Sequence, residues 1–173
     1  MTKKMSKLVP VGSVRSEKEE YAYPLSFFIG TNGVDAQYFE YYLRGYVRGI
    51  GPIESDSVDS DYLDSPVEIS KCELRSELPV EYAFDILPGL ALIRWLIGEQ
   101  IENLECGALL SQGEENLFYF LHPDGEVFLA VAVKWLRGSC EWSVICVDFD
   151  DEIERHKAGT RIFISKQPVA CEK

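Results

Sequence analysis

The chain has 173 residues, a formal net charge of −12, 46% hydrophobic residues and 12% aromatic residues. This length and apolar content predict one domain with a sizeable core and exclude disorder over most of the chain. The acidity excludes the basic surface of a module that binds nucleic acid directly, and it disfavours binding to an anionic membrane.

The negative charge is concentrated in the middle of the sequence. Residues 50–126 carry 17 acidic side chains and three basic ones, whereas residues 1–49 sum to +2 and residues 127–173 sum to zero. A field of one sign attracts basic proteins and can imitate phosphate. The charge pattern therefore indicates a basic protein as the partner.

Cysteine usage and hydropathy indicate a cytoplasmic protein. The five cysteines are an odd number without a Cys-x-x-Cys pair, which is unlike a secreted disulfide framework. The basic N-terminus is not followed by the apolar segment of a signal peptide. The most apolar stretch, residues 86–97, is interrupted by Pro88, Gly89 and Arg94 and is too short to span a bilayer.

The sequence of the first third of the chain indicates a tail followed by a strand-turn-helix unit. Residues 1–20 are polar and of mixed charge, and we expect a mobile tail before a single domain over residues 21–173. Residues 24–29 predict a short buried strand. Residues 36–47 place polar and apolar side chains on opposite faces of a helix. An alternative interpretation of this segment is a strand, with Asn32-Gly33 as a hairpin turn.

The segment at about 51–66 is predicted to be an acidic loop. Residues 54–64 contain five carboxylates, three serines and no cation. Because like charges repel and little apolar surface can be buried there, we expect this loop to be mobile. Residues 66–74 are then expected to return to a strand.

A pair of helices is predicted in the centre of the chain. Pro79 opens a helical region, and the acidic residues Glu81 and Asp85 suit its first turns. Pro88-Gly89 is expected to kink or break this region. A second helix is predicted over residues 90–104, and because it is apolar on nearly all sides we expect it in the core.

Four β-rich runs dominate the rest of the chain, and turn sequences such as His122-Pro-Asp-Gly125 and Arg137-Gly-Ser139 separate them. The runs cover residues 117–122, 127–136, 140–149 and 161–165. The predicted fold class is therefore α+β, with a C-terminal antiparallel β-meander packed against a central helical pair. A strand-turn-helix unit precedes both.

The end of the third run carries the strongest candidate for catalytic chemistry. Residues 144–151 contain Asp148-Phe-Asp150, which resembles the first motif of haloacid-dehalogenase-type phosphatases. The resemblance implies a nucleophilic Asp148 and a proton-transferring Asp150. It covers about eight residues, Glu152 stands where Thr or Val is usual, and the 22 residues after Asp151 leave no room for the downstream sheet of that family. A strand that exits into an acidic turn explains the same residues, and Asp148, Asp150 and Asp151 are weak candidates for holding a divalent metal.

Other metal or cofactor sites lack the spacing that such sites need. The acidic loop has no central glycine, and Val67 occupies the position of the bidentate glutamate of an EF-hand. The two histidines and the cysteines lack the close spacing of a zinc site. We therefore predict no cofactor.

Two functional hypotheses follow from these patterns. The favoured one is an acidic, non-enzymatic protein-binding module, such as an immunity-type or phosphate-mimicking inhibitor, because a nuclease must present Lys and Arg to phosphate. Its expected contacts are the carboxylates of the loop, with an aromatic anchor among them: Glu54, Asp56, Asp59, Asp61, Tyr62 and Asp64. The alternative is a small hydrolase or transferase that uses a divalent metal at residues 148–152.

Overall fold

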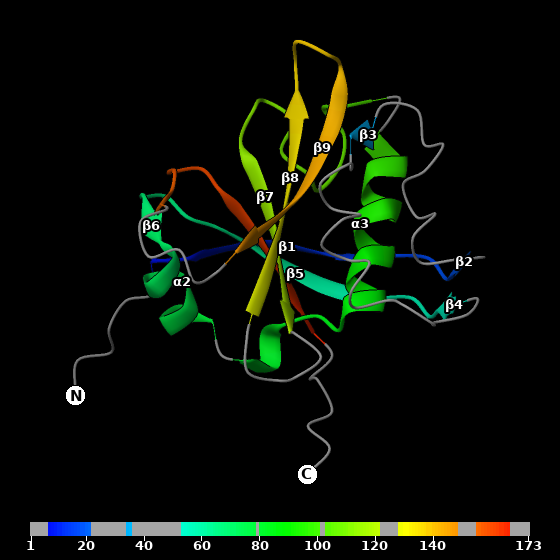
Figure 1. The fold of residues 1–173 in the computed structure, drawn as a ribbon, viewed down its shortest axis with the longest axis horizontal. Coiled ribbons are helices and arrows are strands. Elements are labelled where there is room, and N and C mark those ends of the chain that lie inside the picture. The colour runs from blue at the N-terminus through cyan, green and yellow to red at the C-terminus, as the bar shows by residue number, and fades with distance from the viewer. Residues whose placement is uncertain are drawn as a thin grey trace.

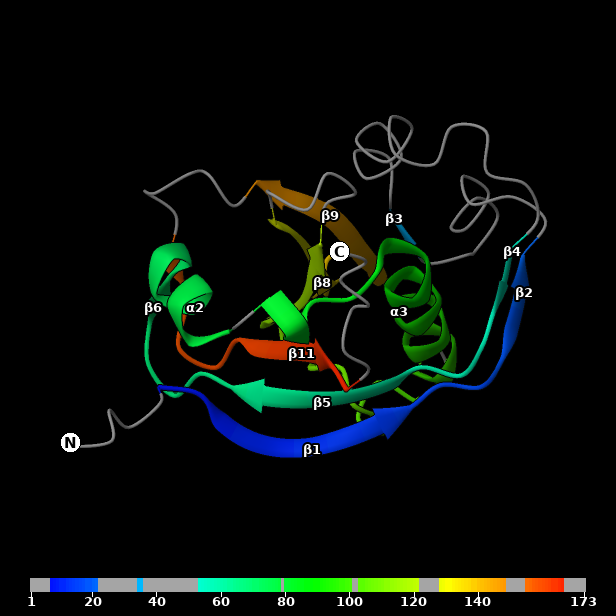
Figure 2. The same cartoon turned by 90° about the horizontal axis from the view of Figure 1, so that it is seen from below.

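The computed structural model of the chain describes residues 7–21, 34–35, 53–78, 80–100, 103–121, 128–148 and 155–166. In these ranges a seven-stranded mixed sheet lies between two helices, α2 (Lys71–Glu77) and α3 (Ile86–Gln100) (Figure 1). A second view shows the same arrangement, with β8 and β9 between the two helices (Figure 2). The α+β class is thus confirmed. None of the helices in the described part of the chain has the length and apolar character that crossing a membrane requires.

The sheet has the strand order β1-β5-β11-β7-β8-β9-β3. Neighbouring strands in the sheet are antiparallel except at two places, where β11 runs parallel to β7 and β3 runs parallel to β9. The strands are β1 (Val9–Arg15), β3 (Val34–Asp35), β5 (Asp59–Asp64), β7 (Glu115–Leu121), β8 (Phe128–Leu136), β9 (Glu141–Asp148) and β11 (Arg161–Ser165). Two separate pairs are formed by β2 (Glu19–Tyr21) with β4 (Ile53–Ser55), and by β6 (Ile69–Ser70) with β10 (Arg155–His156).

The strands β7, β8 and β9 are consecutive antiparallel neighbours, as the pattern of the C-terminal half predicts. A turn at residues 137–140 joins β8 to β9. The fourth predicted run is also a strand, but β11 does not extend the meander. It inserts between β5 and β7 instead. An interior position suits β11 because Ile162, Phe163 and Ile164 are buried and face both sides of the sheet.

In place of the predicted helical pair, the structure has one long helix preceded by a short 3-10 turn, η2 (Val80–Tyr82). Helix α3 runs through Pro88-Gly89, contrary to the expected break. Pro88 lies in the first turn, where N–H groups have no partner within the helix, so its missing N–H removes no hydrogen bond. The N–H of Gly89 donates to the carbonyl of Asp85 at 3.0 Å and closes this turn.

Helix α2 occupies residues for which the sequence predicts a strand. Ser70 and Glu73 form a capping box, in which the Ser70 hydroxyl accepts from the Glu73 N–H and the Glu73 carboxylate accepts from the Ser70 N–H. The Ser-x-x-Glu pattern is a recognised start signal for a helix. The strand prediction over 66–74 is therefore wrong except for β6.

Two segments that the sequence predicts to be mobile form strands. Residues 9–15 of the expected tail are β1, the edge strand that pairs with β5. Most of the expected acidic loop is β4 and β5, and β5 is an interior strand between β1 and β11. Backbone pairing on both edges holds β5 in the sheet, and distant cations compensate its charge. Neither effect is visible in a local stretch of sequence.

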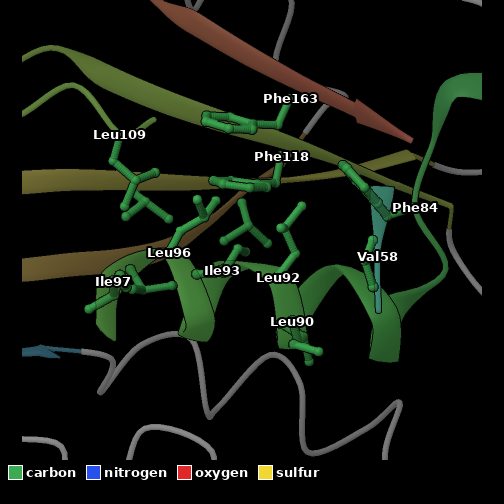
Figure 3. Packing of buried hydrophobic residues seen from close by; sticks show 14 of the residues in the cluster. Val58, Phe84, Leu90, Leu92, Ile93, Leu96, Ile97, Leu109, Phe118 and Phe163 are labelled. Atoms are coloured by element: carbon green, nitrogen blue, oxygen red, sulfur yellow. The ribbon is translucent and has the colours of Figure 1, made fainter. Parts of the chain in front are cut away.

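Apolar side chains form one cluster on each face of the sheet. On the α3 side, Phe118 and Phe163 stack with ring centroids 4.4 Å apart, next to Leu92 and Ile93 of the helix (Figure 3). The cluster on the α2 side contains Ile69, Leu74, Leu117, Tyr119 and Ile162. Consecutive residues of β7 alternate between the two clusters, which explains why this strand is apolar without interruption.

Three of the predicted structural elements fall outside the described residues. They are the strand over 24–29, the helix or strand over 36–47 and the turn at 122–125. The strand-turn-helix unit therefore stays a prediction.

Candidate functional site

The predicted contact residues of β5 do not share one surface. Side chains alternate along a strand, and residues directly opposite each other on neighbouring strands face the same side. Asp61 is opposite Ile164, which belongs to the cluster on the α2 side, whereas Tyr62 is opposite Phe163 on the α3 side. The alternation therefore places Asp59 and Asp61 on one face of the sheet and Tyr62 and Asp64 on the other.

Each carboxylate of β5 has a cation from a neighbouring part of the sheet. Asp59 lies 3.7 Å from Arg15, its register partner on β1. Asp61 lies 2.8 Å from Lys166, directly after β11. Both pairs are substantially exposed to solvent. Ion pairs of this kind contribute little to stability and exchange readily with other charged groups.

Asp64 makes a different kind of pair, because its cation is nearly buried. Arg161 donates from Nε and Nη2 to the two carboxylate oxygens of Asp64 at 2.7 and 2.9 Å. Its Nη1 donates to the carbonyl of Ala108 at 2.7 Å, and its guanidinium lies 4.7 Å from the ring centroid of Tyr62. The Tyr62 ring also packs against Phe163, with centroids 5.5 Å apart. Asp64 and Tyr62 thus have roles within the fold.

Two exposed carboxylates flank a junction between β1 and β5 in the sequence. The Ser16 N–H donates to the carbonyl of Val58, and the Val58 N–H donates to the Ser16 hydroxyl, both at 3.0 Å. Glu17 follows Ser16 directly, and Asp56 precedes Val58 by two residues. Both residues are exposed.

The start of α3 adds a third carboxylate to this region. Val58 lies next to Phe84, which precedes the first residue of α3 by two positions (Figure 3). Asp85 follows Phe84 and is exposed. We refer to the exposed residues Glu17, Asp56 and Asp85 as the acidic end.

Glu54 extends the same region along the chain. It lies on β4, where its register partner is Glu20 of β2. The β2–β4 pair lies beside α3 (Figure 2). Glu54 and Asp56 are therefore the two residues of the predicted contact set that lie at or next to the acidic end.

Of the three predicted metal residues, only Asp148 lies within the described part of the chain. Asp148 is the last residue of β9 and the register partner of Leu129, and Asp150 and Asp151 lie outside the described ranges. Within those ranges no group of three or more His, Cys, Asp or Glu side chains could hold a metal ion. Cys72, Cys106 and Cys140 are free thiols on the surface.

A cleft that the sequence did not indicate lies on the α2 side of the sheet. It has a volume of about 340 Å³ and is lined by residues of the 112–115 segment, by Lys134 of β8, by Arg155 of β10 and by the turn that follows β10. At its edge, Nδ1 of the buried His156 lies 3.2 Å from the Glu115 carboxylate. The Nε2 atom of His156 is buried and has no hydrogen-bond partner within the described residues.

The contact between Glu115 and His156 changes the acidity of the carboxyl group. The hydrogen bond from His156 is the main cause that lowers the pKa of Glu115, and the charges of Lys134 and Lys157 act in the same direction. The ionised carboxylate only accepts hydrogen bonds, so Nδ1 of His156 carries the hydrogen. The two residues are 41 positions apart, and no local motif connects them. Only the three-dimensional structure brings them together and identifies the site.

The chain matches no protein-family model, no curated protein and no solved structure.

Proposed function

We propose that the protein is a non-enzymatic binding module that docks its acidic end on a basic surface of another protein. An immunity-type or phosphate-mimicking inhibitor acts in this way. The observation that supports the proposal is that exposed Glu17 and Asp56 flank the hydrogen-bonded junction of Ser16 and Val58, with exposed Asp85 directly before α3.

The distribution of the remaining charge favours the same function. Residues 50–126 contain only three cations, and one of them, Lys71, is buried with 1% of its surface exposed. This part of the chain is therefore strongly acidic, although cations from elsewhere pair with some of its carboxylates. A negative field accelerates the diffusional encounter with a basic protein and disfavours acidic competitors.

The predicted contact residues take unequal parts in this proposal. Glu54 and Asp56 lie at or next to the acidic end, and we propose them as direct contacts. Asp59 and Asp61 continue along β5, and a basic partner can exchange with their exposed ion pairs, which are worth about 0–1 kcal/mol each. Tyr62 and Asp64 support the surface from within the fold.

A binding experiment with charge variants tests the proposal. The acidic end is neutralised in a Glu17→Gln, Asp56→Asn, Asp85→Asn variant, in which the asparagine introduced at the start of α3 retains the ability to cap a helix. The control is Glu99→Gln with Glu105→Gln, which removes exposed carboxylates at and beyond the other end of α3. Wild-type, variant and control proteins are immobilised and exposed to a host-cell extract at low salt.

The expected result is a basic protein that the wild type and the control retain in simple stoichiometry and release with a salt step. The acidic-end variant should lose this partner while its melting temperature stays close to that of the wild type. Equal retention by all three proteins would show that the acidic end is not the contact surface. Retention of only a mixture of basic proteins would show that the acidity serves solubility.

A further inference from the structure

The cleft on the α2 side carries a charge that is opposite in sign to that of the whole protein. Its lining contains three cations, Lys134, Arg155 and Lys157, and two carboxylates, Glu114 and Glu115. The chain as a whole has a net charge of −12. A local excess of positive charge in an acidic protein is a site where a small anion can bind against the long-range field.

Both carboxylates of the cleft already have hydrogen-bond donors. Glu115 accepts from Nδ1 of His156, and Glu114 accepts from the backbone N–H of Gln112 at 3.0 Å. Glu115 is also the register partner of Lys134, so that carboxylate and cation face the same side of the sheet. These contacts fix the carboxylates at the wall of the cleft and leave their charge partly neutralised.

Two of the cations remain available for a ligand. Lys134 and Lys157 act on Glu115 through their charges but form no direct ion pair with any side chain in the described residues, whereas Arg155 lies 2.9 Å from Glu68 on the exposed surface. Glu68 does not line the cleft. Arg155 can therefore turn one edge of its guanidinium toward a ligand, and its exposed ion pair with Glu68 can either remain or be replaced by the contact with the ligand.

The turn that carries Lys157 is held rigidly. The Thr160 N–H and hydroxyl both donate to the carbonyl of Lys157, at 3.2 and 2.8 Å. The Gly159 N–H donates to the carbonyl of Ser65, and the Ser65 N–H donates to the carbonyl of Thr160, at 2.8 and 3.0 Å. This network anchors the backbone of the turn to the segment after β5, so little backbone ordering is required when a ligand binds.

We propose that this cleft binds the phosphate group of a small molecule, or free phosphate, between Lys134, Arg155 and Lys157. Lysine acts on phosphate as a point charge, and arginine supplies paired N–H donors that match phosphate oxygens. A volume of about 340 Å³ is at the lower end of the range for small-molecule sites, which suits a compact ligand. A nucleic-acid strand is excluded because the net charge of −12 repels a polyanion.

Amide chemical-shift mapping tests this proposal. The ¹⁵N-labelled protein is titrated with inorganic phosphate, with glycerol 3-phosphate and with chloride at constant ionic strength. The expected result is saturable shifts in residues 112–115 and 157–160 with the two phosphate compounds and not with chloride. Tighter binding of glycerol 3-phosphate identifies an organic phosphate as the ligand class, and equal binding identifies the phosphate group alone.

The decisive variant is Lys134→Gln with Lys157→Gln, which removes two positive charges from the cleft. Because a hydrogen bond to a charged group is lost at each position, binding should weaken at least about tenfold. The matched control, Arg15→Gln with Lys166→Gln, removes two charges near β5 and should bind as the wild type does. The proposal is overturned if the wild type shows no saturable shift, if the cleft variant binds equally well, or if a single-stranded oligonucleotide occupies the same residues.

Discussion

Arg161 and Asp64 occupy directly opposed positions on β11 and β5, and two hydrogen bonds of 2.7 and 2.9 Å join their side chains. The arginine is only 9% exposed, and its third contact is the carbonyl of Ala108. The pair therefore links two interior strands of the sheet to the segment that follows α3.

Asp64→Asn should destabilise the protein by about 2 kcal/mol, because it leaves a nearly buried guanidinium without its counter-ion. Urea denaturation followed by far-UV circular dichroism measures the loss. Arg15→Gln serves as the control, since the pair between Arg15 and Asp59 is 3.7 Å long and exposed, and it should change the stability by less than about 0.5 kcal/mol. Equal losses in the two variants would mean that the buried geometry at Arg161 has no energetic consequence.

Gln100 makes a second long-range link, from the end of α3 to Leu109. Its Nε2 donates to the Leu109 carbonyl at 3.0 Å, and its Oε1 accepts from the Leu109 N–H at 2.7 Å. Gln100→Ala should cost about 2–4 kcal/mol, because two buried backbone groups lose their partners. Hydrogen exchange at the Leu109 amide should accelerate in this variant and remain unchanged in the exposed neighbour variant Glu99→Ala.

Substitution of two glycines of α3 by alanine should change the stability of the protein in opposite directions. A Cβ atom at Gly89 would lie 2.3 Å from the Phe120 ring and 2.9 Å from Cβ of Phe84, whereas a Cβ atom at Gly98 would meet nothing within 4 Å. Gly98→Ala should stabilise the protein by about 0.5–1 kcal/mol through helix propensity. Gly89→Ala should destabilise it by about 1–3 kcal/mol through overpacking, despite the same gain in propensity. Thermal unfolding measures the change in stability of each variant. Stabilisation by both substitutions would contradict the close packing of Gly89 against Phe120.

The pair of Glu115 and His156 predicts a pH dependence of stability. The pKa of Glu115 is lowered from its ordinary value of 4.5, mainly by the hydrogen bond from His156. The carboxylate therefore stabilises the folded state fully above about pH 4.5, and this contribution is lost as the pH falls through the lowered pKa. In chemical denaturation between about pH 3 and 6, the free energy of unfolding should decrease less with falling pH in Glu115→Gln than in the wild type. If Glu115→Gln and the wild type had parallel pH profiles, Glu115 would not be the group responsible.

The sequence predicts the central part of the sheet because the signals there are local. β7, β8 and β9 are long apolar runs, and a Gly-Ser turn separates the last two, so propensity and burial lead to the same assignment. The start of α2 was also predictable in principle, from the capping box of Ser70 and Glu73.

The strand β5 and the cleft depend on residues that are distant in sequence. The sequence Asp-Ser-Asp-Tyr-Leu-Asp by itself is typical of a loop. In the folded protein its carboxylates pair with Arg15, Arg161 and Lys166, which are 44 to 105 positions away in the sequence. The same limitation applies to Glu115 and His156. Contacts between distant segments determine both sites, and no local pattern in the sequence reveals that β11 inserts between β5 and β7.

The position of β11 also has a consequence for how the protein acquires its structure during synthesis. Of the described strands of the sheet, β11 is the one translated last, yet it is the only one that connects the β1–β5 pair to the β7–β8–β9 unit. Until it has emerged, each part exposes an unpaired strand edge, which is a site for incorrect pairing with other chains. Assembly of the sheet therefore depends on a five-residue segment, Arg161–Ser165, that pairs with both parts.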